Sequence, residues 1–217
     1  MTVMRSDDLS ITSRRQFLAG GGSLAFSGVF AAAVPRSKLR LGGPIFVKSD
    51  DPAELARAHR SMGYSAAYVP QVSLVESEKI KAIEKAFATE NVVIAEVGAW
   101  RNMLDADAAK RKENLNYVID RLALAEAIGA RNCVNIAGSF NPKQWDGPDA
   151  RNLTREFFDA TVENCRKVID AVKPRRTKFS IEMMGWSLPN SAEAYLKLLK
   201  ARSEEHTSEL QSLRHIS

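Results

Sequence analysis

The chain alternates between short β-like runs and longer helix-like segments over residues 39–201, and this alternation is the strongest constraint on its fold. The β-like runs are residues 39–47, 66–69, 92–97, 132–136 and 177–181. Each precedes a segment of helical periodicity, at about residues 52–62, 77–89, 105–128, 154–172 and 192–200. Strands that alternate with helices in this way predict an α/β fold, in which helices connect the strands of a parallel sheet.

Capping residues mark the ends of several predicted helices. Asp51 followed by Pro52 is a favourable helix start, and Ser191 is suited to cap the last helix. Gly63 and Gly129 stand where helices should stop, because glycine readily adopts the left-handed conformation of a helix end. These boundaries make each helix a discrete connection between two strands.

The two cysteines and the net charge narrow the functional classes. Cys133 falls in a predicted strand and Cys165 in a predicted helix, so both are predicted to be buried thiols. A disulfide stays open as an alternative if the protein is exported. Residues 39–201 carry a net charge of only +3, which argues against a nucleic-acid partner.

One acidic residue stands where a parallel α/β fold builds its active site. The β-rich run before Glu182 ends on that carboxylate, and a loop containing Trp186 and Pro189 follows. Loops after the carboxyl ends of the strands form the active site in such folds. Glu182 is therefore a candidate metal ligand or acid/base. The alternative is a structural acid that caps the next helix or pairs with a surface lysine.

The first 38 residues resemble a twin-arginine export signal. Arg14 and Arg15 precede a weakly apolar, glycine-rich run over residues 18–34, and Ala31–Ala33 offers a small-residue cleavage site. The pattern predicts a periplasmic protein, with the twin-arginine export machinery as a partner and no membrane span after cleavage. The alternatives are an uncleaved anchor and a chance arginine pair.

Residues 202–217 look like a translated sequencing adapter. Arg202 through Ser212 match the codons of an adapter residue by residue. This interpretation divides the chain into a signal and linker (1–38), a domain (39–201) and an artefactual tail (202–217), with the natural gene cut at the domain's end. A natural polar tail is the alternative.

Three sequence pieces resemble the sugar phosphate isomerase/epimerase superfamily, the xylose-isomerase-like TIM barrels. They are residues 97–102 (VGAWRN), residues 127–139 (AIGARNCVNIAGS), and residues 181–186 (IEMMGW) with Pro189 and Ser191. The resemblance covers residues 39–201 and implies a partial (β/α)8 barrel. About five βα units fit in this span, whereas a closed barrel needs eight.

The resemblance implies chemistry for Glu182. In this family the acid at the end of the fifth strand binds a divalent metal (Mn²⁺, Mg²⁺, Co²⁺ or Zn²⁺), and in epimerases it also moves a proton beside a carbonyl. The family's other ligands lie on later strands, so the chain as given is predicted to be inactive. The family often has proline where this chain has Gly185, which leaves the substrate class open.

Four further residues are candidates for binding a sugar or polyol, namely Trp100, Asn102, Asn135 and Trp186. Packing is the alternative for the tryptophans, and capping is the alternative for Asn135. His59 is expected on the surface, and Glu96, inside a strand, in a structural pair. The predicted function is a metal-assisted sugar isomerase or epimerase. A non-catalytic carbohydrate-binding barrel, an abasic-site endonuclease and a homo-oligomer stay open.

Overall fold

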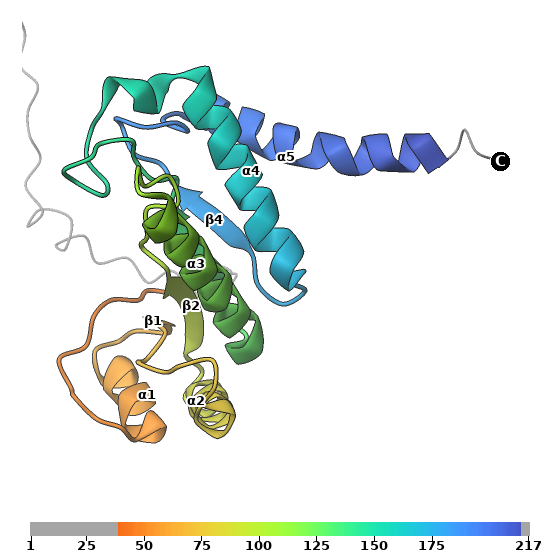
Figure 1. Ribbon diagram of the computed structural model, residues 1–217. Coiled ribbons are helices and arrows are strands. Elements are labelled where there is room, and N and C mark those ends of the chain that lie inside the picture. The colour runs from red at the N-terminus through yellow and green to blue at the C-terminus, as the bar shows by residue number, and fades with distance from the viewer. Residues whose placement is uncertain (1–38, 214–217) are drawn as a thin grey trace, which may run out of the picture. The chain divides into compact units, whose positions relative to one another are not determined.

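The computed structural model describes residues 39–213, with side chains through Arg202. The helices are α1 (Pro52–Ser61), α2 (Ser77–Thr89), α3 (Ala108–Ile128), α4 (Arg155–Val172) and α5 (Ala192–Leu213), with a short 3₁₀ helix, η2 (Ala150–Leu153). The strands are β1 (Ala66–Tyr68), β2 (Val93–Gly98), β3 (Asn132–Ile136) and β4 (Phe179–Glu182). Strands and helices alternate as the sequence predicts (Figure 1).

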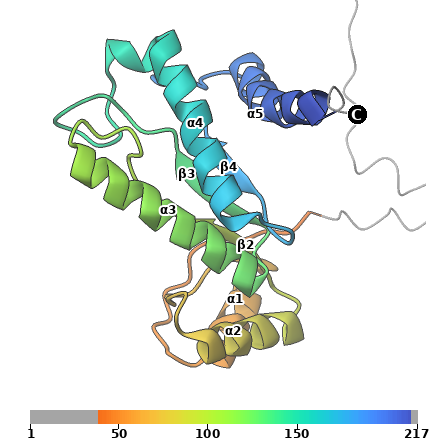
Figure 2. The same cartoon turned by 45° about the vertical axis from the view of Figure 1, so that its right-hand side comes forward.

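The four strands form one parallel sheet in the order β1-β2-β3-β4. Each strand pairs with the next one along the chain, for example Glu96 with Asn132 and Ile136 with Glu182. Helices α2 and α3 contact β2, and α3 and α4 run side by side over the sheet (Figures 1 and 2). Sequential parallel strands with external helices are the arrangement of an incomplete (β/α)8 barrel, so the predicted fold class is confirmed.

The first predicted strand is an exception. Between residues 39 and 47 the described structure has only one isolated bridge, from Gly42 to Ala66. A Cβ at residue 42 would lie 2.7 Å from the Ala66 carbonyl oxygen, so glycine permits this approach. Pro44 has no N–H to donate, and the Phe46 side chain is 86% exposed. Without burial of its apolar side chains, the run does not form a strand, and four strands stand where five were predicted.

The predicted helix caps are largely confirmed. The Asp51 carboxylate accepts a hydrogen bond from the Ala53 N–H at 2.9 Å, and Ser191 Oγ accepts one from Ala194 N–H at 3.2 Å. Gly129 ends α3 with a φ of 71°, a left-handed conformation that glycine adopts without strain. The predicted start of α3 at residue 105 moves to Ala108, because the Asp107 carboxylate caps that helix.

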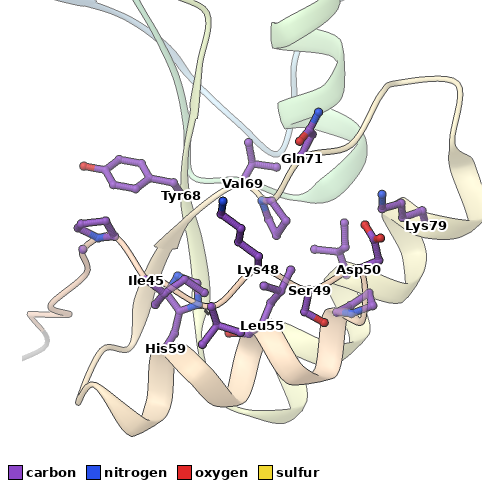
Figure 3. A pocket seen from close by; sticks show the side chains of 16 residues that line it. Ile45, Lys48, Ser49, Asp50, Leu55, His59, Tyr68, Val69, Gln71 and Lys79 are labelled. Carbon is purple, nitrogen blue, oxygen red and sulfur yellow. Dashed lines mark hydrogen bonds between the residues drawn. The ribbon is translucent and has the colours of Figure 1, made fainter.

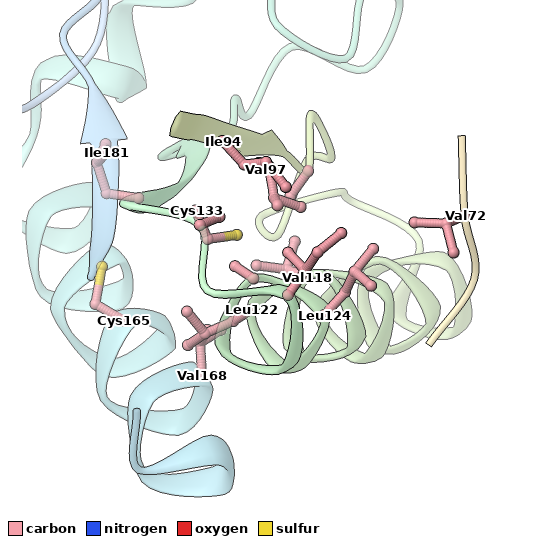
Figure 4. Packing of buried hydrophobic residues seen from close by; sticks show 14 of the residues in the cluster. Val72, Ile94, Val97, Val118, Leu122, Leu124, Cys133, Cys165, Val168 and Ile181 are labelled. Carbon is pink, nitrogen blue, oxygen red and sulfur yellow. The ribbon is translucent and has the colours of Figure 1, made fainter. Parts of the chain in front are cut away.

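The core fills the space between the sheet and the helices. In Figure 4, Val97 of β2 and Cys133 of β3 face Val118 and Leu122 of α3, and all four side chains are buried. Cys165 of α4 is also buried, and both thiols are free, as predicted. Burial raises the pKa of each cysteine to about 12, so both are neutral thiols at neutral pH.

The last helix is longer than predicted. It continues from Ala192 to Leu213, through most of the segment interpreted as an adapter. Its start packs on α4, and Leu198 is buried. Across residues 39–213, no helix is long and apolar enough to cross a membrane. The predicted export signal lies outside the described residues.

Candidate active site

A cavity of about 710 Å³ lies against the sheet strands and reaches their carboxyl ends. Its lining comes from all four strands, the residues just after β1 and β2, and one side chain of α3. The lining residues are Tyr68, Val69, Glu96, Gly98, Trp100, Arg121, Asn132, Val134, Ser180, Ile181 and Glu182. This is the place where the predicted fold class should form a substrate site.

Glu182 stands at the end of β4 with an exposed side chain. One alternative role for Glu182 is to cap the following helix, but the residue that caps this helix is Ser191. Among residues 39–202, no ion pair with a lysine or arginine is found for Glu182. Its carboxylate is therefore not committed to an ion pair or a helix end.

Glu96 of β2 is a second carboxylate in the same cavity. Burial raises the pKa of Glu96, and the negative charge of Glu182 raises it further. The two acids therefore differ in environment, since Glu96 is partly buried in its strand and Glu182 is exposed at the rim. The sequence analysis expected a structural pair for Glu96 and missed its place in the cavity, although its position near the end of a strand was a signal that could have found it.

Trp100 and Arg121 complete the functional lining. Trp100 follows β2 and is 38% exposed, and its indole lies against Gly98, where a Cβ would come within 2.0 Å of Nε1. Arg121 of α3 donates from Nε to the Gly98 carbonyl oxygen at 3.1 Å. Arg121 supplies positive charge to a cavity that holds two acids. Nothing in the sequence of the long helix distinguished it from a surface arginine.

The two asparagines predicted to bind sugar are not among the cavity's lining residues. Asn102 is 2% exposed: its Oδ1 accepts from the N–H groups of Leu104 and Ser139, and its Nδ2 donates to the Ser139 carbonyl. Asn135 is fully buried, with Oδ1 accepting from Arg101 N–H at 2.8 Å and Nδ2 donating to Arg101 O at 3.0 Å. Both amides therefore hold loop backbone.

Three further buried asparagines act in the same way. Their amides bond to backbone or hydroxyl groups of the loops after β2 and β3: Asn114 to Asn102 O, Asn152 to Phe140 N, Ser139 Oγ and Gly147 O, and Asn164 to Met103 O. Sequence patterns do not reveal these clamps, because the partners lie on different elements. The clamps set the shape of the loops at the carboxyl end of the sheet.

Trp186 also lies outside the cavity lining. Its indole Nε1 donates to the Asp146 carbonyl oxygen at 2.7 Å, which ties the loop after β4 to the loop after β3. The side chain is 41% exposed. Of the five residues predicted for the site, the structure thus brings Glu182 and Trp100 together at one cavity.

The described residues do not form a complete metal site. No group of three or more histidine, cysteine, aspartate or glutamate side chains is placed to hold an ion within this part of the chain. Glu96 and Glu182 are the two carboxylates of the cavity, whereas Mg²⁺ and Mn²⁺ prefer about six oxygen-rich positions. The donor set on these four strands does not fit a bound divalent ion by itself.

A second cavity, of about 670 Å³, lies beside α1 (Figure 3). Segment 43–50, α1, the end of β1 and α2 form its walls. His59 lines it and is 5% exposed, which corrects the expectation of a surface histidine. The ring packs against Phe87 of α2 at 5.6 Å between centroids, and Nδ1 lies 2.8 Å from the Leu55 carbonyl oxygen. The apolar face of α1 therefore extends to this histidine.

Several solved structures with a similar fold are described as sugar isomerases or epimerases. An L-ribulose 3-epimerase superposes with a TM-score of 0.57 at 19% identity, covering 76% of this chain and 57% of that one. A putative xylose isomerase from Rhodospirillum rubrum gives a TM-score of 0.54 at 14% identity, covering 70% and 56%. The D-psicose 3-epimerase of Clostridium cellulolyticum H10, solved with D-tagatose, gives 0.53 at 14%, covering 70% and 54%.

The chain thus spans little more than half the length of these structures, and at such identities the likeness shows the fold. No curated protein matches the sequence. A family profile described as a xylose isomerase-like TIM barrel matches residues 56–207, which is more than half of the chain. The match includes β1–β4, the Glu182 cavity and the loops that asparagines hold in place. The chain belongs to the xylose isomerase-like TIM barrel family.

Proposed function

We propose that the complete protein is a sugar isomerase or epimerase whose substrate binds in the cavity at the carboxyl ends of β1–β4. The observation that carries this proposal is the pair of carboxylates, Glu96 and Glu182, that line one cavity with Trp100 and Arg121. The solved structures of similar fold include epimerases of L-ribulose and D-psicose. Ketopentoses and ketohexoses are therefore the first substrates to test.

The two carboxylates suit proton transfer beside a carbonyl. Such a reaction needs one group to remove a proton from carbon and a protonated group to return one. The Glu182 carboxylate lies exposed at the rim and would act as the base, whereas Glu96 would act as the acid, because burial and the charge of Glu182 raise its pKa. Two acids in different environments are typical of acid/base pairs. Arg121 has the charge that stabilises an enediolate oxygen.

Trp100 would form one wall of this substrate site. Sugars expose C–H faces that pack on aromatic rings, and the Trp100 indole is partly exposed within the cavity lining. Asn102, Asn135 and Trp186 would act on the substrate only through the loops they hold, since none of the three is among the lining residues. A divalent ion in the complete protein would take Glu182 as one ligand and would need its other ligands from residues beyond the described ones.

The decisive variant is Glu182→Gln in the complete protein. The amide keeps the size of the side chain and removes its charge, so turnover should fall by at least the ~10²-fold typical of general-base loss. Glu78→Gln, on the exposed face of α2, is the matched control and should keep full turnover. Solvent deuterium incorporation into the sugar measures the proton transfer directly.

The outcomes also separate an enzyme from a binding protein. Sugar binding without deuterium exchange in the unmutated protein would favour a non-catalytic carbohydrate-binding barrel. Full turnover in Glu182→Gln would contradict the role of Glu182. The 217-residue chain by itself should show no turnover, because within residues 39–213 β4 is an edge strand and no group of acids is placed to hold a metal ion.

We also propose that the protein is exported by the twin-arginine pathway and that residues 202–217 derive from an adapter. Replacing Arg14 and Arg15 together by lysine should abolish export of a folded reporter fused after Val34, because that pathway reads the arginine pair. Periplasmic fractionation measures the result, and unchanged export would contradict the signal. Resequencing the gene across residue 201 tests the adapter.

A further inference from the structure

The residue that walls the candidate substrate cavity has an unusual backbone. Trp100 has a φ of 49°, in the left-handed region that residues with a Cβ rarely adopt. Such a conformation persists only when the surrounding structure enforces it, and it is common where a side chain must be aimed for function. The contacts around Trp100 show what enforces it.

Strand β3 holds the backbone on both sides of Trp100. The Ala99 N–H donates to the Val134 carbonyl oxygen at 2.8 Å, as a continuation of the sheet. One residue further along β3, the Asn135 amide bonds to both the N–H and the carbonyl of Arg101, at 2.8 and 3.0 Å. Since Ala99 and Arg101 are both fixed, Trp100 must make the turn between them.

A second set of contacts fixes Arg101 from outside the sheet. Its guanidinium lies 4.2 Å from the ring centroid of Tyr117 on α3, and its Nη1 donates to the Trp100 carbonyl at 3.1 Å. The Trp100 indole then lies over Gly98, where a Cβ would be 2.0 Å from Nε1 and 2.8 Å from Cδ1. Glycine at position 98 is therefore part of the same arrangement.

We propose that Asn135 is a positioning residue that acts through Arg101 to hold the Trp100 indole over Gly98 as a wall of the Glu96–Glu182 cavity. Asn135 is fully buried and is not among the lining residues, so it does not touch the substrate itself. An amide carries its acceptor and its donors on separate atoms, so Asn135 can bond to the Arg101 N–H and carbonyl at the same time. The inference depends on the proposed function only in taking the cavity as the place where the substrate binds.

The test follows Trp100 fluorescence in the 217-residue chain with Trp145→Phe and Trp186→Phe, which leave Trp100 as the only tryptophan. Asn135→Asp keeps the acceptor for the Arg101 N–H but faces the Arg101 carbonyl with a second acceptor. We expect a red-shifted emission and at least a roughly twofold larger acrylamide quenching constant, because the indole leaves its site. Gly98→Ala should give the same signature with Asn135 intact.

The matched control is Asn152→Asp, which alters an equally buried asparagine whose partners lie in the loop after β3. Its Trp100 emission and quenching should stay unchanged. A folded Asn135→Asp chain with unchanged Trp100 quenching would overturn the proposal. If that variant does not fold, amide exchange in the unmutated chain decides: the Arg101 N–H should exchange at least about tenfold more slowly than an unstructured amide. Exchange at the unstructured rate would equally overturn it.

Discussion

The loops after β2 and β3 and the segment before α1 are both irregular, but they are held in opposite ways. In the loops, buried asparagine amides such as Asn102 and Asn135 bond to the backbone on several sides. In residues 44–48, no backbone hydrogen bond is found within the described structure, and Phe46 is 86% exposed. Irregular backbone is therefore held in one conformation here where polar side chains form hydrogen bonds with its N–H and C=O groups. An apolar composition alone does not fix the backbone in this way.

The largest expected effect is on stability, from Asn102→Ala. The substitution leaves the N–H groups of Leu104 and Ser139 and the Ser139 carbonyl without their partner, and both residues are buried. Each unsatisfied buried group costs about 1–3 kcal/mol, so we expect a loss of roughly 3 kcal/mol or more. Urea denaturation followed by circular dichroism measures the free energy of unfolding.

The matching change in the other region is Phe46→Ser. Phe46 is exposed, and its replacement should alter the free energy of unfolding by less than about 0.5 kcal/mol. A loss below about 1 kcal/mol for Asn102→Ala, or a larger loss for Phe46→Ser than for Asn102→Ala, would break the comparison between the two regions. The comparison matters because residues 39–47 have the more strand-like sequence.

Trypsin should distinguish the two regions next. Lys48 and Arg101 both have exposed side chains, yet only Arg101 has its N–H and carbonyl bonded to a buried amide. A protease must draw its substrate into an extended conformation, so cleavage after Lys48 should be at least about tenfold faster than after Arg101. Mass spectrometry of a short digestion measures both rates.

Asn135→Asp provides the control for the digestion. The substitution should accelerate cleavage after Arg101 and leave the rate of cleavage after Lys48 unchanged, because Asn135 bonds to Arg101 and not to Lys48. Equal rates at the two sites in the unmutated chain would show that the loop after β2 opens as easily as the segment before α1.

The same contrast explains what the sequence could predict. Asp51 before Pro52, Gly129 and Ser191 act on residues only a few positions away in the chain, so their patterns identified the helix ends correctly. The prediction of a first strand was wrong, because a strand needs a hydrogen-bonded partner strand and burial of its side chains. Residues 39–47 pair with another strand only at Gly42. Local patterns therefore succeed where the interaction is local.

In the candidate site, too, local features could be predicted from the sequence and distant contacts could not. The position of Glu182 at a strand end could be predicted, because strand ends are visible in the sequence and the family motifs include them. The hydrogen bonds of Asn102 and Asn135 could not be predicted, since an asparagine near a strand end looks the same whether it faces a cavity or bonds to a loop 34 or 37 residues away. Arg121 reaches the cavity from a helix, and no spacing in the sequence marks it.

The smallest expected effect concerns Glu96. Burial and the charge of Glu182 raise the pKa of Glu96 above its usual value of 4.5. A raised pKa means that the folded state binds the proton more tightly than the unfolded state. The stability from this group is therefore fully present below the unfolded pKa and is lost as the pH rises through the raised pKa. Glu96→Gln removes this loss, so its melting temperature relative to the unmutated chain should rise as the pH increases above the ordinary value of 4.5.

Asp149 gives the opposite control for that measurement. Hydrogen bonds from the Arg151 side chain and backbone lower its pKa to about 2, so its stabilising effect is present above the ordinary pKa of 3.8 and is lost as the pH falls toward 2. Asp149→Asn should therefore melt lower than the unmutated chain at neutral pH, and the difference should shrink in acid. If Glu96→Gln showed the same acid-dependent loss as Asp149→Asn, Glu96 would be an ordinary paired acid. Its proposed role as the acid partner of Glu182 would then be wrong.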